Sequence, residues 1–312
     1  MGRGLFSSGV RFTPATDIPS LAGKVILVTG GNSGLGKQSV LDLAQHSPAL
    51  IWLAARGEAR AQAAIDDILK QVPGAALKPL DLDLASFASV KAAARRVLAE
   101  SGRLDILLLN AGIMATPAGV TTEGYEVQFG TNHVGHALLT RLLLPQLLQT
   151  AEQPGTDVRI VVLTSDAHKL APREGINFDT LKSSQESMWT TTRYGQSKLA
   201  NILFAFELGR RYPRIKAMSV HPGFVQSNLM NPLVASSAIM RPLAPIGKWL
   251  MAVPPLEGVK NQLWAAVSPD AKTGTYYVPV GKGGREETIA KDQELAKRLW
   301  EWTEKELEGQ VV

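Results

Sequence analysis

Two residues of one helical stretch have types and a spacing that suit proton transfer. Tyr194 and Lys198 are four positions apart, so a helix would place both side chains on one face, one turn apart. The unperturbed pKa of a tyrosine is about 10, and a neighbouring ammonium favours the phenolate and lowers that pKa. The pair therefore suits a general acid or base that exchanges a proton with a substrate oxygen. Only Tyr212 also has a lysine four positions later, and Pro213 separates it from Lys216, so that pair is not expected to share a helix face.

A glycine-rich turn precedes the first long helical stretch. It follows a short apolar run and reads Thr29-Gly30-Gly31-Asn32-Ser33-Gly34-Leu35-Gly36. Glycines at such a turn let the backbone approach a pyrophosphate, whose charge is favoured at a helix N-terminus. A simple tight turn is the alternative, but the place of this turn between a strand and a helix favours a dinucleotide site. The residues expected to contact the cofactor here are Gly30, Asn32, Ser33, Gly34, Leu35 and Gly36.

Short apolar runs alternate with amphipathic stretches along most of the chain. Strands are predicted at residues 24–29, 50–54, 76–80, 104–109, 158–164, 215–220 and 274–279, and helices at 35–45, 59–71, 86–101, 123–150, 194–212, 256–267 and 290–307. This alternation implies right-handed crossovers and a parallel sheet covered on both faces. The expected fold is α/β: a single doubly wound Rossmann domain with a seven-stranded parallel sheet flanked by helices. It would span residues 21–312, after an N-terminal arm at residues 1–20.

Several motifs in this order resemble the signature of the short-chain dehydrogenase/reductase family. The glycine turn reads Thr-Gly-x-x-x-Gly-x-Gly, and Asn110-Ala111-Gly112, Pro222-Gly223 and Asp83-Leu84 are similar to further cofactor-binding elements of that family. The resemblance implies that the acid–apolar pair contacts adenine and that the Pro-Gly turn lies beside the nicotinamide. Asp81-Leu82 is a second candidate for the adenine pair, although the spacing to Ser89-Val90 favours Asp83.

The resemblance extends to a catalytic set. Ser165, after the predicted strand 158–164, resembles the family's serine that hydrogen-bonds the substrate oxygen. Asn132 resembles an asparagine that bends a helix and holds a water in the proton relay, and Tyr194 and Lys198 complete the set, both also binding the cofactor. The separation of Ser165 and Tyr194 by 29 positions exceeds that of the compact members. This extra length, with Asp166-Ala167-His168, resembles the retinol dehydrogenase-like and WW-domain oxidoreductase-like branch.

The end of the second predicted strand bears on the choice of cofactor. An acid at this place would hydrogen-bond a free ribose 2′-hydroxyl, and Ala55 stands there instead. Arg56, helped by Arg60, offers planar guanidinium donors to a 2′-phosphate, which predicts NADP(H) as the cofactor. Solvated surface arginines are the alternative, and Glu58 is the nearby residue that argues against a phosphate site.

The segment after the Pro-Gly turn is predicted to contact both cofactor and substrate. By the resemblance, Val225 and Ser227 bind the nicotinamide carboxamide, with Ser227 keeping the hydroxyl of the family's usual threonine. Residues 228–255 are rich in Met, Pro, Leu and Ala, and such adaptable side chains on an irregular segment suit a lid over a lipophilic substrate. A helix pair packed on the core, or a contact in a homo-oligomer, is the alternative.

Composition excludes several other classes. The chain has no cysteine, which rules out disulfides, thiolate metal sites and cysteine nucleophiles. Its net charge of +5 comes from scattered Lys and Arg residues, so nucleic acid is not an expected partner. His133 and His136 have no carboxylate neighbours, so no metal is expected. Charges and prolines interrupt residues 236–255, so no transmembrane segment is expected, and we expect a cytoplasmic protein.

The sequence therefore predicts an NADPH-dependent oxidoreductase. It would reduce a ketone or aldehyde of a lipophilic or polyketide-like small molecule, or run the reverse alcohol oxidation, with a tyrosine as general acid or base. Oxidation of a retinol- or steroid-like alcohol with NAD(P)+ is the alternative reaction. A non-catalytic dinucleotide-binding regulator is the alternative class, and fold alone does not separate it from an enzyme.

Overall fold

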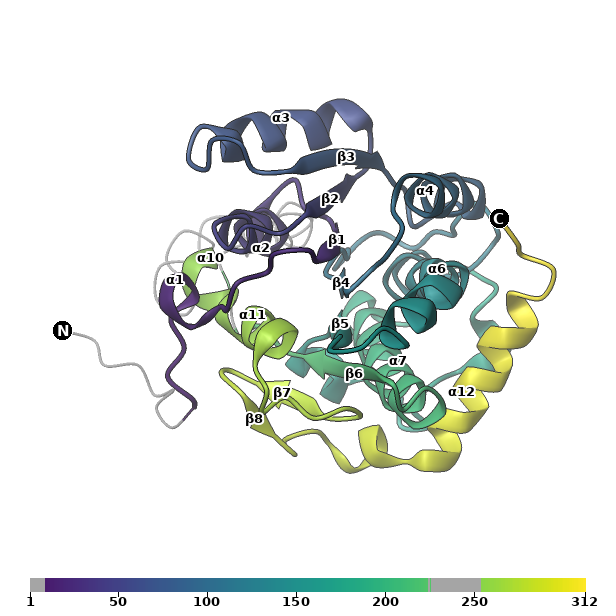
Figure 1. The fold of residues 1–312 in the computed structure, drawn as a ribbon. Helices are drawn as coiled ribbons and strands as arrows, with labels where there is room; N and C mark the ends of the chain where they lie inside the picture. Colours follow the sequence, from purple (N-terminus) through teal and green to yellow (C-terminus); the bar gives the residue numbers. More distant parts are fainter. Residues whose placement is uncertain (1–8, 224, 226–253) are drawn as a thin grey trace, which may run out of the picture.

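The computed structural model describes residues 9–223, 225 and 254–312, and in this part of the chain one eight-stranded sheet lies between two layers of helices (Figure 1). The strand order is β3-β2-β1-β4-β5-β6-β7-β8. Strands β1 to β7 are parallel to their neighbours, and β8 runs antiparallel to β7. Successive strands are added on one side of β1 up to β3, and from β4 onward on its other side. Open α/β sheets bind ligands at such a switch point, here between β1 and β4, outside the carboxyl ends of the strands.

The elements have the following bounds. The strands are β1 (Val25–Thr29), β2 (Leu50–Ala55), β3 (Leu77–Asp81), β4 (Ile106–Leu109), β5 (Val158–Leu163), β6 (Ile215–Val220), β7 (Tyr276–Val278) and β8 (Lys282–Gly283). The α-helices are α1 (Pro14–Asp17), α2 (Gly34–Ala44), α3 (Glu58–Leu69), α4 (Phe87–Glu100), α5 (Val127–Phe129), α6 (Gly135–Ala151), α7 (Thr190–Arg211), α10 (Pro255–Gly258), α11 (Lys260–Val267) and α12 (Gln293–Glu306). A π-helical turn η1 (Gly130–Val134) joins α5 to α6, and η2 (Asp166–Leu170), η3 (Phe178–Thr180) and η5 (Thr288–Lys291) are short 3-10 helices.

The doubly wound Rossmann architecture is confirmed, but the predicted number of seven strands is wrong. All seven predicted strands are present, and β8 adds an eighth at the edge. This strand has two residues, Lys282 and Gly283, and so carries no apolar run that a sequence pattern could detect. The predicted helix 123–150 also differs, because it begins at Val127 and contains the π-helical turn η1.

Two apolar clusters form the core, one on each face of the sheet. Side chains alternate between the faces along a strand, so that Leu27 of β1 packs with α4, α6, α7 and α12, whereas Ile26 and Val28 pack with α2, α3 and α11. All three are fully buried. Burial of a side chain of this size stabilises the fold by about 1.5–3 kcal/mol.

The described part of the predicted N-terminal arm lies against the second of these clusters. Phe12 and Ile18 of the arm are buried there, as is Leu21, the first residue after it. The backbone N–H of Val10 donates to the carbonyl oxygen of Val280 over 2.9 Å, so the segment from residue 9 onward is attached to the turn between β7 and β8.

The carboxyl ends of the strands meet at one edge of the sheet. The register pairs Thr29 of β1 with Ala54 of β2, and Leu163 of β5 with Val220 of β6. The residues that follow these strands are therefore neighbours along that edge. They include Gly30 after β1, Arg56 after β2, Asn110 after β4, Ser165 after β5 and Pro222 after β6.

Candidate active site

Helix α7 carries the Tyr194–Lys198 pair on a buried face. The two residues are 5% and 3% exposed, and Lys198 Nζ lies 5.5 Å from the centre of the Tyr194 ring. The ammonium donates a hydrogen bond to the carbonyl oxygen of Leu163 at the end of β5, over 3.1 Å. Burial raises the pKa of Tyr194 to about 12 and lowers the pKa of Lys198 to about 8. In this protein burial thus outweighs the lowering that the ammonium was expected to cause, and Tyr194 keeps its proton at neutral pH.

Ser165 lies next to the tyrosine at the start of η2. Its hydroxyl forms a hydrogen bond with Tyr194, which lowers the phenol pKa by less than burial raises it. The same oxygen accepts from the backbone N–H of Ala167 over 3.2 Å. Gly195 lets η2 come this close to α7, because a Cβ there would lie 2.6 Å from the carbonyl oxygen of Ala167. The motif around Tyr194 contains this glycine, but its packing role was not predicted.

Asn132 lies in the π-helical turn η1 and is fully buried. Its Oδ1 accepts from the backbone N–H of Ile113 over 2.8 Å, while its Nδ2 donates to the Ile113 carbonyl and to the Ser197 hydroxyl. A Cβ on Gly112 would lie 3.2 Å from Asn132 Oδ1 and 3.4 Å from Lys198 Nζ. The structure therefore brings Asn132, Lys198 and the Asn-Ala-Gly segment to one place.

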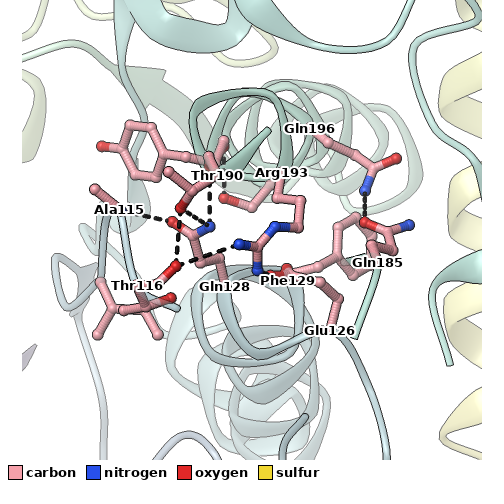
Figure 2. A network of polar contacts seen from close by, with 12 residues as sticks. Ala115, Thr116, Glu126, Gln128, Phe129, Gln185, Thr190, Arg193 and Gln196 are labelled. Carbon is pink, nitrogen blue, oxygen red and sulfur yellow. Dashed lines mark hydrogen bonds and ion pairs between the residues drawn. The ribbon is translucent and has the colours of Figure 1, made fainter. Parts of the chain in front are cut away.

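A buried polar network holds the first turn of α7 (Figure 2). Arg193, directly before Tyr194, donates to the Glu126 carboxylate over 2.9 Å and to the carbonyl oxygen of Thr116 over 3.3 Å. The two charged side chains are 4% and 0% exposed. An ion pair at this depth fixes the position of the helix residue that precedes the tyrosine.

Gln128 also connects the segment that contains Ala115 and Thr116 to α7 (Figure 2). Its Oε1 accepts from the backbone N–H of Ala115 over 2.9 Å, and its Nε2 donates to the carbonyl oxygen of Thr190 over 3.0 Å. Ala115 has a φ of 55°, which non-glycine residues seldom adopt. Sequence reasoning missed this network, because its members are polar residues far apart in the chain that no motif connects.

The glycine turn between β1 and α2 has the shape of an anion site. Gly30 and Gly34 have φ of 67° and 52°, which favours glycine. A Cβ on Gly36 would overlap the carbonyl oxygen of Gly30, whereas one on Gly34 would meet nothing within 4 Å and would fill open space. Helix α2 begins after Ser33 without a side-chain cap or an acidic residue in its first turn, and Asn32 beside it is half-buried. Its N–H groups thus suit a pyrophosphate, and the turn fits a dinucleotide.

Residues Asn110 and Ala111, which follow β4, form hydrogen bonds with Thr29 directly before this turn. Asn110 Nδ2 donates to the carbonyl oxygen of Thr29 over 2.8 Å, and the backbone N–H of Ala111 donates to the Thr29 hydroxyl over 3.0 Å. Gln262 of α11 reaches Asn110 Oδ1 over 3.3 Å. The end of β4 is therefore fixed to the residue before the first glycine.

The two acid–apolar pairs after β3 differ in their surroundings. Asp83 is half-buried and its backbone N–H donates to the Ser89 hydroxyl over 2.9 Å, while Leu84 is buried. Asp81 is exposed and accepts from the backbone N–H of Gly57 over 2.7 Å, at the start of α3. Both acids lie at the cofactor edge, and an adenine contact of Asp83 stays a prediction.

Arg56, directly after β2, and Arg60, in the first turn of α3, are both exposed. In the part of the chain that the structure describes, neither guanidinium has a hydrogen bond or an ion pair. Glu58, the residue that argued against a phosphate site, pairs with Arg96 of α4 over 3.1 Å. The two arginines are thus available to a ligand while the nearby carboxylate is engaged elsewhere.

The Pro-Gly turn follows β6 at the same edge. Pro222 and Gly223 are half-buried, and Gly223 has a φ of 87°. A Cβ on Gly258 of α10 would overlap Val225 and lie 3.1 Å from Leu35 Cδ2, so the two predicted cofactor residues Val225 and Leu35 meet at α10. Ser227 and all of the predicted lid except residues 254 and 255 lie outside the described residues.

Asn261 of α11 is a structural residue of this edge that was not predicted. It is fully buried, and its Nδ2 donates to the carbonyl oxygens of His221 and Tyr277 over 2.8 and 3.0 Å. Its Oδ1 accepts from the backbone N–H of Gly281 over 3.0 Å. One side chain thus joins the ends of β6 and β7 below the Pro-Gly turn.

The buried histidines are engaged in the core. His133 packs on Phe129 and Phe204, and burial lowers its pKa to about 3. His168 accepts from the backbone N–H of Glu287 at Nε2 and contacts the Ser165 carbonyl through Nδ1. Among the residues described, no group of three or more His, Asp or Glu side chains is arranged to hold a metal ion. None of the helices in the described ranges is long and apolar enough to cross a bilayer.

Sequence comparison shows the family of the chain. The short chain dehydrogenase family model matches residues 24–238. The chain is 39% identical to the short-chain dehydrogenase/reductase drtF of Aspergillus calidoustus, over 93% of this chain and 95% of the relative. It is 38% identical to retinol dehydrogenase 14 of Mus musculus, over 90% of this chain and 85% of the relative.

Solved structures agree with this assignment. An uncharacterized protein from Mycobacterium paratuberculosis superposes with a TM-score of 0.73 at 30% identity, over 96% of this chain and 97% of the other. A gluconate 5-dehydrogenase from Burkholderia cenocepacia, solved with NADP and tartrate, has a TM-score of 0.64 at 20% identity over 84% and 95% of the two chains, which shows the shared fold alone. The family model, the relatives and the fold agree: the chain belongs to the short-chain dehydrogenase/reductase family, whose enzymes use a nicotinamide dinucleotide, and to its retinol dehydrogenase-like branch.

Proposed function

We propose that the protein is an NADP(H)-dependent reductase of a ketone or aldehyde in a lipophilic or polyketide-like small molecule. The observation that carries the proposal is the convergence of Ser165, Tyr194, Lys198 and Asn132 at the edge of the sheet that also holds the glycine turn. A dinucleotide-binding regulator would need the turn but not this set of four side chains.

The protein's own groups account for the proton chemistry. The nicotinamide, when bound, supplies the hydride or accepts it. Ser165 offers its hydroxyl to the substrate oxygen, and Tyr194, hydrogen-bonded to it, donates the proton that the reduced oxygen takes up. Because burial raises the tyrosine pKa to about 12, the side chain is in the protonated form that reduction requires. The Lys198 ammonium stabilises the phenolate that remains.

The choice of NADP(H) rests on Arg56 and Arg60. Their guanidinium groups are exposed, have no partner within the described residues, and lie just after β2 and in the first turn of α3, where they suit a 2′-phosphate. The ion pair of Glu58 with Arg96 engages one nearby carboxylate that would otherwise repel that phosphate.

The lipophilic substrate is supported by the composition of residues 228–255, which we propose as a substrate lid, and by the relatives. Retinol dehydrogenase 14 is named for a long apolar alcohol. The same likeness favours a second candidate, oxidation of a retinol- or steroid-like alcohol with NAD(P)+.

A cofactor and substrate panel tests the proposal. NADPH and NADH consumption would be followed with bulky ketones, aldehydes and quinones, and NADP+ reduction with retinol- and steroid-like alcohols. We expect faster consumption of NADPH with at least one bulky carbonyl compound. Turnover of the alcohols alone would favour the second candidate, and cofactor binding without turnover on a broad panel would favour a regulator.

A further inference from the structure

His136 is a buried polar residue that the proposed chemistry leaves unused. It lies in the first turn of α6, four positions after Asn132, and is 1% exposed. Its Nδ1 is 3.0 Å from the carbonyl oxygen of Asn132, and its Nε2 is 2.9 Å from the hydroxyl oxygen of Thr29. Thr29 is the last residue of β1, directly before the glycine turn. The imidazole therefore connects Asn132 to the residue directly before the glycine turn.

The partners of the ring determine its tautomer. A carbonyl oxygen can only accept, so Nδ1 must carry the hydrogen. Burial, with the nearby charge of Lys198, lowers the pKa of His136 to about 4, so the ring is neutral at neutral pH. Its Nε2 then accepts from the Thr29 hydroxyl, which itself accepts from the backbone N–H of Ala111 over 3.0 Å. These bonds run in one direction, from Ala111 through Thr29 and His136 to Asn132, and each polarises the next.

The carbonyl oxygen of Asn132, at which this series of hydrogen bonds ends, lies in the π-helical turn η1. In η1 the N–H of Gly135 bonds to the carbonyl of Gly130, one residue further back than in an α-helix. The side chain of Asn132 is fixed independently by Ile113 and Ser197. The carbonyl is thus the part of Asn132 whose position the imidazole can govern.

We propose that His136 is a positioning residue for proton delivery: it holds the backbone carbonyl of Asn132, a residue whose side chain meets Lys198 at Gly112, and through Thr29 it couples the position of that carbonyl to the glycine turn. The proposal rests on the proposed function, in which Asn132 belongs to the set of four converging side chains and Lys198 stabilises the Tyr194 phenolate. It assigns a role to a buried histidine that the proposed proton chemistry does not use.

Two substitutions each remove one of the two hydrogen bonds of the His136 ring, the one to Thr29 or the one to Asn132. His136→Asn keeps a donor near the place of Nδ1 and removes the acceptor, and the Thr29 hydroxyl can then turn to the carbonyl oxygen of Leu108, 3.5 Å away. His136→Gln keeps an acceptor near the place of Nε2 and removes the donor to Asn132. Each variant loses the ring and one hydrogen bond, so each is the control for the other.

The readouts are kcat, the KM for NADPH, the solvent isotope effect on kcat, and the melting temperature. We expect His136→Gln to lose about tenfold in kcat, as the loss of one net hydrogen bond allows, with a larger solvent isotope effect and a KM that stays within about twofold. His136→Asn should keep kcat within about threefold. Equal losses of kcat in two variants of equal melting temperature would overturn the proposal, because a merely structural histidine would not distinguish them.

Nitrogen-15 NMR of the wild-type imidazoles tests the proposal without turnover or a folded variant. His136, assigned through its contact with Thr29, should be neutral, protonated at Nδ1, and free of titration between about pH 6 and 8. Addition of NADP+ should shift its Nδ1 resonance, because the series of hydrogen bonds passes through Thr29, directly before the glycine turn. An Nε2-protonated ring, or a resonance that bound NADP+ leaves unchanged, would overturn the proposal. If these signatures hold while the substrate panel gives no turnover, the proposed function fails and the coupling stands.

Discussion

Replacement of Arg56 by alanine should reduce the preference for NADP(H) by weakening the binding of that cofactor alone. The side chain is exposed and has no partner within the described residues, so its removal breaks no internal bond and leaves the fold unchanged. A hydrogen bond to a charged group contributes about 1.5–3 kcal/mol, and solvent screening at an exposed site favours the lower end of that range. This corresponds to a loss of about tenfold in affinity for NADP+.

The assay is titration of NADP+ and NAD+ against wild type, Arg56→Ala and two further variants. Arg60→Ala should have a smaller effect, because Arg60 is one helical turn further from the strand end. Arg214→Ala is the control, since it also removes an exposed arginine, one that is paired with Glu152 and lies before β6 at the opposite edge of the sheet. Raising the salt concentration should shrink the Arg56 effect. An equal change for both cofactors, or none, would show that Arg56 and Arg60 are ordinary surface residues.

Three further predictions concern the network, the lysine and the proposed lid. Arg193→Met leaves the Glu126 carboxylate buried without its partner and should lower the free energy of unfolding by about 3–5 kcal/mol. In denaturant titrations the double variant Arg193→Met, Glu126→Gln should recover part of this loss. If it recovers none, the ion pair does not stabilise the fold. As the pH rises through about 8 the Lys198 ammonium loses its proton, so kcat/KM for NADPH should be level below that pH and fall above it, whereas a rate that still climbs at pH 9 would contradict the role of the charge. Amide exchange in residues 228–255 should slow when NADP+ and a substrate analogue bind; full protection that binding leaves unaltered would mean a static core or subunit contact.

The motifs could be predicted because each is local. The glycine turn, Asn110-Ala111-Gly112, and the spacing of Tyr194 and Lys198 are short patterns, and the parallel sheet brings the ends of their strands together. The alternation of apolar runs with amphipathic stretches was enough to place seven strands along the chain and to predict a doubly wound fold.

The features that were missed depend on contacts between distant parts of the chain. Arg193 and Glu126 are 67 positions apart, and no pattern marks either as buried. The turn η1 depends on the bonds of Asn132 to Ile113, 19 positions earlier, so the helix 123–150 reads as regular from its sequence. The rise of the Tyr194 pKa through burial was not predicted, because a sequence shows the nearby ammonium but not how deeply the phenol is buried.

In the proposed reaction Tyr194 supplies the proton to the substrate oxygen, and Tyr194→Phe tests this role most directly. The substitution removes only the hydroxyl, so NADPH affinity and melting temperature should stay close to those of wild type. Positioned acids contribute about 10²–10⁴-fold to a rate, so single-turnover oxidation of bound NADPH by a carbonyl substrate should slow by at least about a hundredfold. A variant that binds NADPH normally and retains more than about a hundredth of the wild-type rate would show that the proton comes from another group.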